Sequence, residues 1–515
     1  MTTDTKRKSL TEPLAARAVD VHGGGPTLFL HPFDVHRMGL HAGESVRVTI
    51  GTLPDAPAIV NVSATLVQPG EAGLSGELVG RAGALTGQPV TLAVARRVTS
   101  VQWIRHKLDG GRLSPEQIQA VVRDIARGSF THIEVTAWAS ALQVHGMDTD
   151  EVVAYVNAMV ASGERIRFDT GPVMDVHSIG GVPGNKYAPI AVPIVACHGL
   201  KIPKTSSRAI SSACGTADFM EVVTPVSLSS AEIKRITEEV GGVLAWGGGV
   251  QLAPADDAII RVEYPLALDP KAQLLASVLS KKVAVGATDV LIDIPVGDGA
   301  KIPDEAAARA LAHDFITVGQ RVGLKVEVSL SKGSQPVGRT IGPLLEIREA
   351  LQVLEGQTEA QAVIDKACTF AGRLLEMGGV AQPGRGKALA NATLADGRAL
   401  AKFRAIIGAQ GGDPDVQSKN LNPGPLSIPL HTYDAGLVVG VHNPDLVQIA
   451  RAAGCPRDQG AGLMLDCQPG DRVEAGGVLY TIYAEHQHRL DAAAELARKL
   501  RPFRIEGGEV MEIVR

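Results

Sequence analysis

The chain has 515 residues, of which 45% are hydrophobic and 20% charged, a composition typical of a folded globular protein with about three domains. The net charge of −5 is too small and the apolar fraction too high for a mainly disordered protein. Aromatic residues make up only 3% and there is no basic excess, which argues against a surface that binds nucleic-acid polymers.

The cysteines and the apolar runs indicate where the protein works. The five cysteines form no C-x-x-C pair, so a zinc ribbon or dithiol site has no support, and their odd number suits a reducing compartment. The first ten residues lack the apolar core of a signal peptide, and the run Tyr187–Leu200 is too short to span a membrane. We expect a cytoplasmic protein with no membrane partner.

Residues 1–95 are predicted to form a β-rich N-terminal extension. Its β-branched runs are broken by Gly, Pro and Asp turns, and they cover Thr27–Leu30, Ser45–Ile50, Ala58–Leu66 and Val90–Val94. Because the segment holds few candidate catalytic groups, we interpret it as a small barrel-like domain used for packing or assembly.

Residues 96–240 are predicted to form a mostly helical domain. Ser114-Pro115-Glu116 is a typical helix start, with Ser as N-cap and Pro at the first position. A second amphipathic helix is predicted over Thr149–Ser162, where Gly163 ends the pattern. Further helical stretches are expected over 187–200 and 208–240.

Residues 241–410 alternate short apolar strands with helices, which predicts an α/β domain. The strands Val290–Ile294 and Lys325–Leu330 are each followed by a glycine-containing loop. Ligands of open α/β sheets bind beyond the carboxyl ends of strands, where both loops would lie. Residues 409–427 read as a linker, and 428–515 as a C-terminal α+β domain. The fold class is therefore a multi-domain α/β protein.

The densest chemical signal is the segment Asp175–Lys186, which reads DVHSIGGVPGNK. Its three glycines let backbone N–H groups approach an anion closely, just before a predicted helix. The spacing fits neither of the common nucleotide-binding glycine motifs. An anion site and an ordinary tight turn are equally consistent with the residues, and His177 alone also fits a hydrogen-bonded core histidine.

The second signal is the segment Lys204–Asp218, which gathers two cations and several hydroxyl side chains. Hydroxyl donors and cations together suit a phosphate group. The alternative is a capped helix start with a salt bridge. We expect the two segments to converge on a single tetrahedral oxyanion.

Both segments resemble one family. His177-Ser178-x-Gly180-Gly181, Ser207-Arg208-Ala209 and Gly215-Thr216-Ala217-Asp218 look like the signature of the thymidine phosphorylase and pyrimidine nucleoside phosphorylase family. The resemblance covers roughly residues 100–505. Because residues 1–95 are additional to ordinary members, the chain resembles the longer subgroup that includes archaeal AMP phosphorylases.

The resemblance implies phosphorolysis, in which inorganic phosphate attacks C1′ of a nucleoside or nucleoside 5′-monophosphate and releases the free base. It makes Asp269 the proton donor and places His177 near the sugar or base. It assigns Ser277, Lys281 and Lys301 to base or sugar binding. The implied phosphate ligands are Ser178, Gly181, Lys186, Ser207, Arg208, Ala209, Ile210, Ser211, Ser212 and Thr216.

The resemblance also implies no metal, no cofactor beyond phosphate as co-substrate, and a homodimer or higher homo-oligomer. One position departs from it, because the family places Lys directly before the motif histidine and here that residue is Val176. Lys186, Lys204 or Arg208 would then have to supply the missing cation.

Simpler interpretations of the base-side residues stay open. Asp269 precedes Pro270 and fits a helix N-cap, while adjacent Lys281 and Lys282 are typical of a solvated helix face. Lys301 fits a surface lysine. A nucleotide substrate would need a second phosphate site, for which Lys204, Lys301 and Lys332 are candidates.

Two other functions compete. A phosphoribosyltransferase of similar build would need magnesium held by acidic residues, and Asp256-Asp257 is the close acidic pair in the right region. A carrier module would need a lysine at an exposed hairpin tip, and the turns near residues 460 and 470 show none. Release of base that needs phosphate and no magnesium would favour the phosphorylase.

Overall fold

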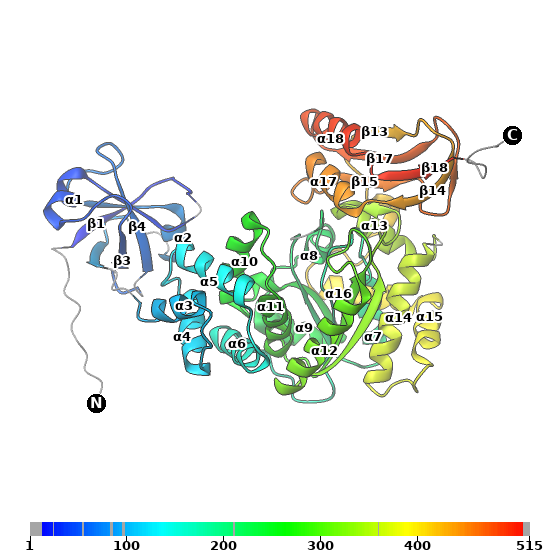
Figure 1. Ribbon diagram of the computed structural model, residues 1–515, viewed down its shortest axis with the longest axis horizontal. Helices are drawn as coiled ribbons and strands as arrows, with labels where there is room; N and C mark the ends of the chain where they lie inside the picture. The colour runs from blue at the N-terminus through cyan, green and yellow to red at the C-terminus, as the bar shows by residue number, and fades with distance from the viewer. Residues whose placement is uncertain are drawn as a thin grey trace.

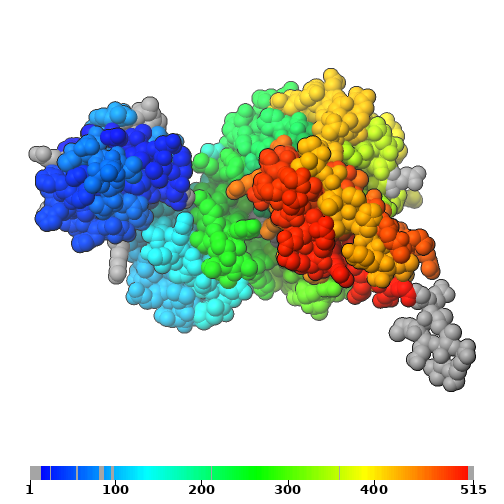
Figure 2. Space-filling model, turned by 90° about the horizontal axis from the view of Figure 1, so that it is seen from above, coloured from blue at the N-terminus to red at the C-terminus, as the bar shows by residue number. Residues whose placement is uncertain are grey.

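The computed structural model describes residues 13–23, 25–53, 56–82, 86–94, 98–209, 212–358 and 360–507. It has the predicted multi-domain α/β organisation: a barrel, a helical bundle, an α/β domain and a C-terminal α+β domain (Figure 1). The barrel lies at one end of the molecule, and the C-terminal domain lies over the α/β domain (Figure 2).

The N-terminal strands close into a six-stranded barrel, so its sheet has no free edge. Alternate residues Val46, Val48 and Ile50 fill its interior. Its strands, in barrel order, are β1 (Leu14–Ala18), β5 (Glu71–Leu74), β2 (Thr27–Leu30), β4 (Ala56–Val62), β3 (Ser45–Ile50) and β6 (Pro89–Val94), with the short helices α1 (Pro32–Met38) and α2 (Gly76–Ala82) at its ends.

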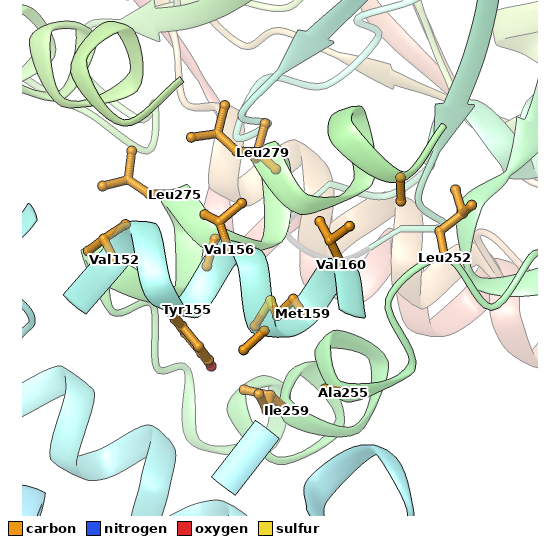
Figure 3. Packing of buried hydrophobic residues seen from close by; sticks show 14 of the residues in the cluster. Val152, Tyr155, Val156, Met159, Val160, Leu252, Ala255, Ile259, Leu275 and Leu279 are labelled. Carbon is orange, nitrogen blue, oxygen red and sulfur yellow. The ribbon is translucent and has the colours of Figure 1, made fainter. Parts of the chain in front are cut away.

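The helical bundle combines residues from two parts of the chain. The predicted Ser114 cap is present as a capping box with Gln117, and Asp148 caps the helix predicted over Thr149–Ser162. Two later helices pack onto these, and Figure 3 shows Val156 and Met159 among their apolar side chains. The members are α3 (Val101–Leu108), α4 (Pro115–Ala126), α5 (His132–His145), α6 (Thr149–Ser162), α10 (Pro254–Leu266) and α11 (Lys271–Ala284).

The α/β domain is built on parallel strands. β11 (Lys325–Lys332), β10 (Asp289–Val296) and β7 (Met174–Ser178) pair in that order, as do β8 (Ile202–Ser206) and β9 (Gly242–Trp246). A bridge between Val173 and Lys201 links the two sets. Along β10, Leu291 joins one hydrophobic core and Ile292 the other, so apolar helices cover both faces of the sheet.

Helices of the α/β domain flank these strands. They are α7 (Ala188–Cys197), α8 (Thr216–Met220), α9 (Ser230–Val240), α12 (Glu305–Arg321), α13 (Pro343–Leu354), α14 (Gln361–Met377), α15 (Gly386–Ala395) and α16 (Arg398–Ala409), with the single turns η1 (Gly247–Gly249) and η2 (Ser418–Asn420). The helical stretch predicted over 208–240 is interrupted between α8 and α9. The predicted boundary at residue 240 falls between the paired strands β8 and β9, because short apolar runs do not reveal whether they are strand or helix.

The C-terminal domain contains two small sheets and two helices. One sheet has the order β12 (Thr340–Ile341), β15 (Gly462–Leu465), β17 (Val478–Ala484) and β13 (Leu426–His431), and the other β16 (Arg472–Val473), β14 (Gly436–Val441) and β18 (Phe503–Glu506). The helices are α17 (Asn443–Ala453) and α18 (Gln487–Leu500).

The C-terminal domain is joined to the α/β domain at several points. Strand β12, which directly precedes α13, pairs with β15. Ala213 and Ile341 belong to the C-terminal hydrophobic core, and Arg451 donates a hydrogen bond to the Ser212 carbonyl at 2.9 Å. Across the described ranges, no helix has the length and apolar character needed to cross a bilayer.

Candidate active site

The two segments singled out in the sequence begin at the same edge of the parallel strands. β7 ends at Ser178 and β8 at Ser206, and these neighbouring strands run in the same direction. Their carboxyl ends therefore deliver both following loops to one side of the sheet. Lys186 and Cys214, one from each segment, are close enough to interact electrostatically. The expected juxtaposition of the two segments is present.

The first loop, which follows β7, has a backbone conformation that depends on glycine. Gly180, Gly181 and Gly184 all have positive φ angles, which favour glycine. A Cβ atom on Gly181 would lie 2.8 Å from the backbone nitrogen of Lys301, so the loop is seated directly against that residue. Asn185 donates to Ser178 Oγ at 3.1 Å, which leaves the Ser178 hydroxyl hydrogen available to an anion.

The surroundings of Lys186 do not fit its predicted role as a phosphate ligand. Its side chain is fully buried, and Nζ lies 2.8 Å from a Glu349 carboxylate oxygen and 2.8 Å from the Gly184 and Val337 carbonyls. All its donor capacity is used inside the protein. Lys186 fixes the shape of the loop, and the missing cation of position 176 has to come from elsewhere.

The second segment folds around Asp218. This carboxylate accepts the backbone N–H groups of Ala209 and Gly215 at 2.7 and 2.9 Å. Arg208 makes two hydrogen bonds to Glu221, at 2.6 and 2.7 Å, which raise the pKa of its guanidinium, and it stacks over Trp246. The salt bridge of the simpler interpretation is therefore real, and two proposed phosphate donors, Arg208 and Ala209 N–H, already have partners.

The other predicted phosphate ligands of the second segment differ in whether their hydroxyl groups already have partners. Ser207 is exposed beside the strand end, and Thr216 begins α8. Ser212 donates to the Cys214 carbonyl at 2.6 Å. Ile210 and Ser211, both predicted phosphate ligands, lie outside the described residues.

His177 is held neutral by its surroundings. Burial lowers its pKa well below the usual value, and the positive charges of the nearest lysines lower it further. Its Nδ1 atom is buried and makes no hydrogen bond to any described residue. The lysines concerned are Lys282, Lys204, Lys281 and Lys301.

Two buried lysines, Lys204 and Lys282, meet at the carbonyl of Thr205. Both Nζ atoms contact the Thr205 carbonyl, at 3.0 and 3.3 Å, and Lys282 also pairs with Asp175 at 2.7 Å. Burial, followed by repulsion from Lys282, lowers the pKa of Lys204 to about 7. The interpretation of Lys282 as a solvated residue is wrong, because its side chain is 1% exposed.

Asp256 organises the predicted base-binding residues. Its buried carboxylate accepts hydrogen bonds from Gln273 at 2.7 Å and Ser277 at 2.8 Å, and Lys281 Nζ lies 2.5 Å away. Tyr155 in turn donates to Gln273. Ser277 and Lys281 are thus fixed side by side on one face of α11, although a solvated helix face was the simpler expectation.

Asp269 and Lys301 form an ion pair, with Oδ2 and Nζ 2.7 Å apart. The side chain of Asp269 is 47% exposed and that of Lys301 is 21% exposed. The alternative that Asp269 caps α11 is wrong, because Pro270 is the N-cap residue and no side chain bonds to that helix end. The pair lies next to the first loop through Lys301.

Sequence reasoning missed Glu263. It lies on α10 seven residues after Asp256, a spacing that places both on one helix face. Burial, together with the negative charges of Asp256 and Asp269, raises its pKa to about 8. The seven-residue spacing of two acids on an apolar helix was the available signal.

Known proteins share this organisation. Models for a glycosyl transferase helical bundle domain, a glycosyl transferase α/β domain and a pyrimidine nucleoside phosphorylase C-terminal domain match residues 101–163, 170–400 and 437–503. The chain is 44% identical over 494 residues to an AMP phosphorylase of Methanococcoides burtonii, covering 96% of this chain and 97% of the relative. It is 43% identical over 493 residues to the AMP phosphorylase of Pyrococcus furiosus, covering 95% and 97%.

Among solved structures, an anthranilate phosphoribosyltransferase from Thermus thermophilus superposes with a TM-score of 0.50 at 19% identity. The match covers 60% of this chain and 99% of that one. This likeness concerns the fold alone.

Proposed function

Because the chain belongs to the AMP phosphorylase family of glycosyl transferases, we propose that it cleaves nucleoside 5′-monophosphates with inorganic phosphate. The products are the free base and ribose 1,5-bisphosphate. One observation carries the proposal most: the neighbouring parallel strands β7 and β8 deliver the glycine-rich loop and the hydroxyl-rich loop to one edge of the sheet. Backbone N–H groups and hydroxyls gathered at one strand edge suit the binding of a phosphate group.

The attacking phosphate is assigned to the two loops. The Ser178 hydroxyl, the Gly181 N–H and the hydroxyls of Ser207 and Thr216 are the donors, and Lys204 supplies charge. Holding phosphate in line with C1′ converts a bimolecular attack into a step within one complex. The 5′-phosphate is assigned to Lys301, which faces the same loop.

The base and its developing charge are assigned to α11 and to Asp269. Ser277 and Lys281, oriented by Asp256, hold the base edge. Asp269 delivers a proton as the glycosidic bond breaks, so the base leaves neutral. Neutral His177 accepts a hydrogen bond from the sugar or base without adding a further positive charge.

The phosphoribosyltransferase alternative fits less well. It needs free carboxylates for magnesium, yet Asp256 is saturated by Gln273, Ser277 and Lys281. A carboxylate paired at 2.5 Å with an ammonium is a poor metal ligand.

The remaining expectations belong to the same proposal. The enzyme works in the cytoplasm as a homodimer or larger homo-oligomer and uses no cofactor beyond phosphate. The N-terminal barrel serves packing or assembly.

The deciding experiment measures release of free base from AMP, CMP, UMP, adenosine, uridine and thymidine, with and without phosphate and with EDTA. We expect release that requires phosphate, survives EDTA and favours nucleotides over nucleosides by at least about a hundredfold, or about 2.7 kcal/mol. Equal rates of base release from nucleosides and nucleotides would show that the protein has no second phosphate site. Release that depends on magnesium and pyrophosphate would establish the phosphoribosyltransferase instead.

A further inference from the structure

Lys301, to which the 5′-phosphate is assigned, lies in a tightly packed turn after β10. Within the turn, Gly297 N–H donates to the Ile302 carbonyl at 3.2 Å and Ala300 N–H donates to the Gly297 carbonyl at 3.0 Å. A Cβ atom on Gly181 would lie 2.8 Å from the Lys301 backbone nitrogen, so the first loop packs against the turn. Whatever else packs against this turn also helps to fix the Lys301 backbone, and with it the reach of the ammonium group.

A second contact of this turn comes from the C-terminal domain. Asn443 and Pro444 are the first two residues of α17. A Cβ atom on Gly299 would lie 3.2 Å from Pro444 Cδ and 3.6 Å from Asn443 Cβ. Gly299 also has a φ angle of +74°, which favours glycine. The start of α17 therefore packs directly against the turn that carries Lys301.

Asn443 adds a specific hydrogen bond to this contact. The residue is 1% exposed, and its Nδ2 donates to the Gly333 carbonyl at 2.8 Å. Gly333 follows β11 and lies against the same turn, because a Cβ atom there would lie 2.7 Å from Ala300 Cβ. Asn443 Oδ1 is buried without a hydrogen-bond partner among the described residues, so the amide makes this one bond. It ties α17 to the loops that follow β10 and β11.

We infer that Asn443 is a positioning residue for Lys301, through which the C-terminal domain sets the preference of the enzyme for a 5′-phosphorylated substrate. The inference rests on the proposed function, in which Lys301 binds that phosphate. A lysine ammonium on a flexible stem meets a phosphate at lower entropic cost when its backbone is already fixed. Loss of the link should therefore weaken binding of a nucleotide and leave a nucleoside, which has no such phosphate, nearly unaffected.

The test compares AMP with adenosine as substrates of the full-length enzyme in the presence of phosphate. For Asn443→Ala we expect the KM for AMP to rise about tenfold, with kcat for AMP and both constants for adenosine within about twofold of wild type. Asn443→Asp keeps the shape of the side chain but cannot donate to the Gly333 carbonyl, so it should show the same split. A merely structural role would lower the rates with both substrates together.

Gln468→Ala is the matched control. Gln468 Nε2 donates to the Gly338 carbonyl at 2.9 Å, which also links the C-terminal domain to the α/β domain but at a carbonyl outside the Lys301 turn. Thermal melts measure how much stability each variant loses. Gln468→Ala should leave the ratio of kcat/KM for AMP to that for adenosine unchanged.

A double variant shows whether Asn443 acts through Lys301. Lys301→Met alone should remove most of the preference for AMP, and adding Asn443→Ala should change the ratio no further. A wild-type ratio in Asn443→Ala, or a loss that adds in full to that of Lys301→Met, would overturn the inference. A wild type that releases no base with phosphate, or that has no preference for AMP over adenosine, would instead refute the proposed function, so the two failures are distinguishable.

Discussion

Two sets of charged and polar groups in the site differ in how completely the fold pairs them. Around the two loops, the most obvious cations of the sequence motifs form ion pairs within the protein. Lys186 pairs with Glu349, and Arg208 pairs with Glu221. The groups left for an anion there are mainly hydroxyls and backbone N–H groups.

Elsewhere in the site, by contrast, some buried groups remain incompletely matched. Lys204 has a pKa near 7, Glu263 has a pKa near 8 and no hydrogen-bond partner for Oε1 within the described chain, and His177 Nδ1 is likewise without one. The paired charges belong to the framework of the fold, while Lys204 and Glu263 have pKa values close to neutral pH.

Lys186→Met gives the largest expected effect and tests the framework half of this contrast. Removing the ammonium leaves Glu349 buried without its counter-ion, which should cost about 3–5 kcal/mol of unfolding free energy. Urea unfolding measures the loss. A variant of wild-type stability with a raised KM for phosphate would instead return Lys186 to the binding site.

Asp269→Asn tests the chemical half. We expect kcat for base release to fall by about 10²–10⁴-fold with KM nearly unchanged, because the amide cannot donate the proton. Steady-state kinetics with AMP, together with a thermal melt as a folding control, decides it. Unchanged turnover would refute the proton-donor role.

Stability against pH probes Glu263 without any assay of activity. Its pKa is raised from 4.5 to about 8 in the folded protein. Its contribution to stability is therefore complete below about 4.5 and is lost as pH rises through about 8. Glu263→Gln should gain on the wild type between pH 5 and 9 by about 1–3 kcal/mol. A constant difference in melting temperature across that range would contradict the shifted pKa.

Ser178→Ala has the smallest expected effect and tests the proposed phosphate ligands. Loss of one hydrogen bond to a charged ligand should raise the KM for phosphate about tenfold, or about 1.4 kcal/mol, while the KM for AMP stays similar. Asn185→Ala, which removes only the partner of Ser178, should have a weaker effect in the same direction. A larger effect on AMP than on phosphate would exchange the two assignments.

The sequence predicts local structure well where caps or alternation are strong. The strands at 27–30 and 45–50 and the helix at 149–162 have the expected bounds. The helical prediction for 208–240 and the domain boundary at 240 differ from the structure, because pairing of β8 with β9 depends on contacts between distant residues.

Contacts between distant residues also limit what the sequence predicts about the candidate site. Local motifs point to both loops, to Asp269 and to the Ser277–Lys281 helix. The ion pairs Lys186–Glu349 and Lys282–Asp175 join residues far apart in the sequence, so no local pattern reveals that both lysines are buried in ion pairs.

The hydrogen bond from Arg451 to Ser212, the pairing of β12 with β15 and the burial of Ala213 in the C-terminal core have a mechanical consequence. These contacts fix the C-terminal domain against the segment that carries Ser207 and Thr216. We therefore expect these two parts to keep one fixed arrangement when substrate binds. A cross-link between the C-terminal domain and the α/β domain should therefore leave turnover intact.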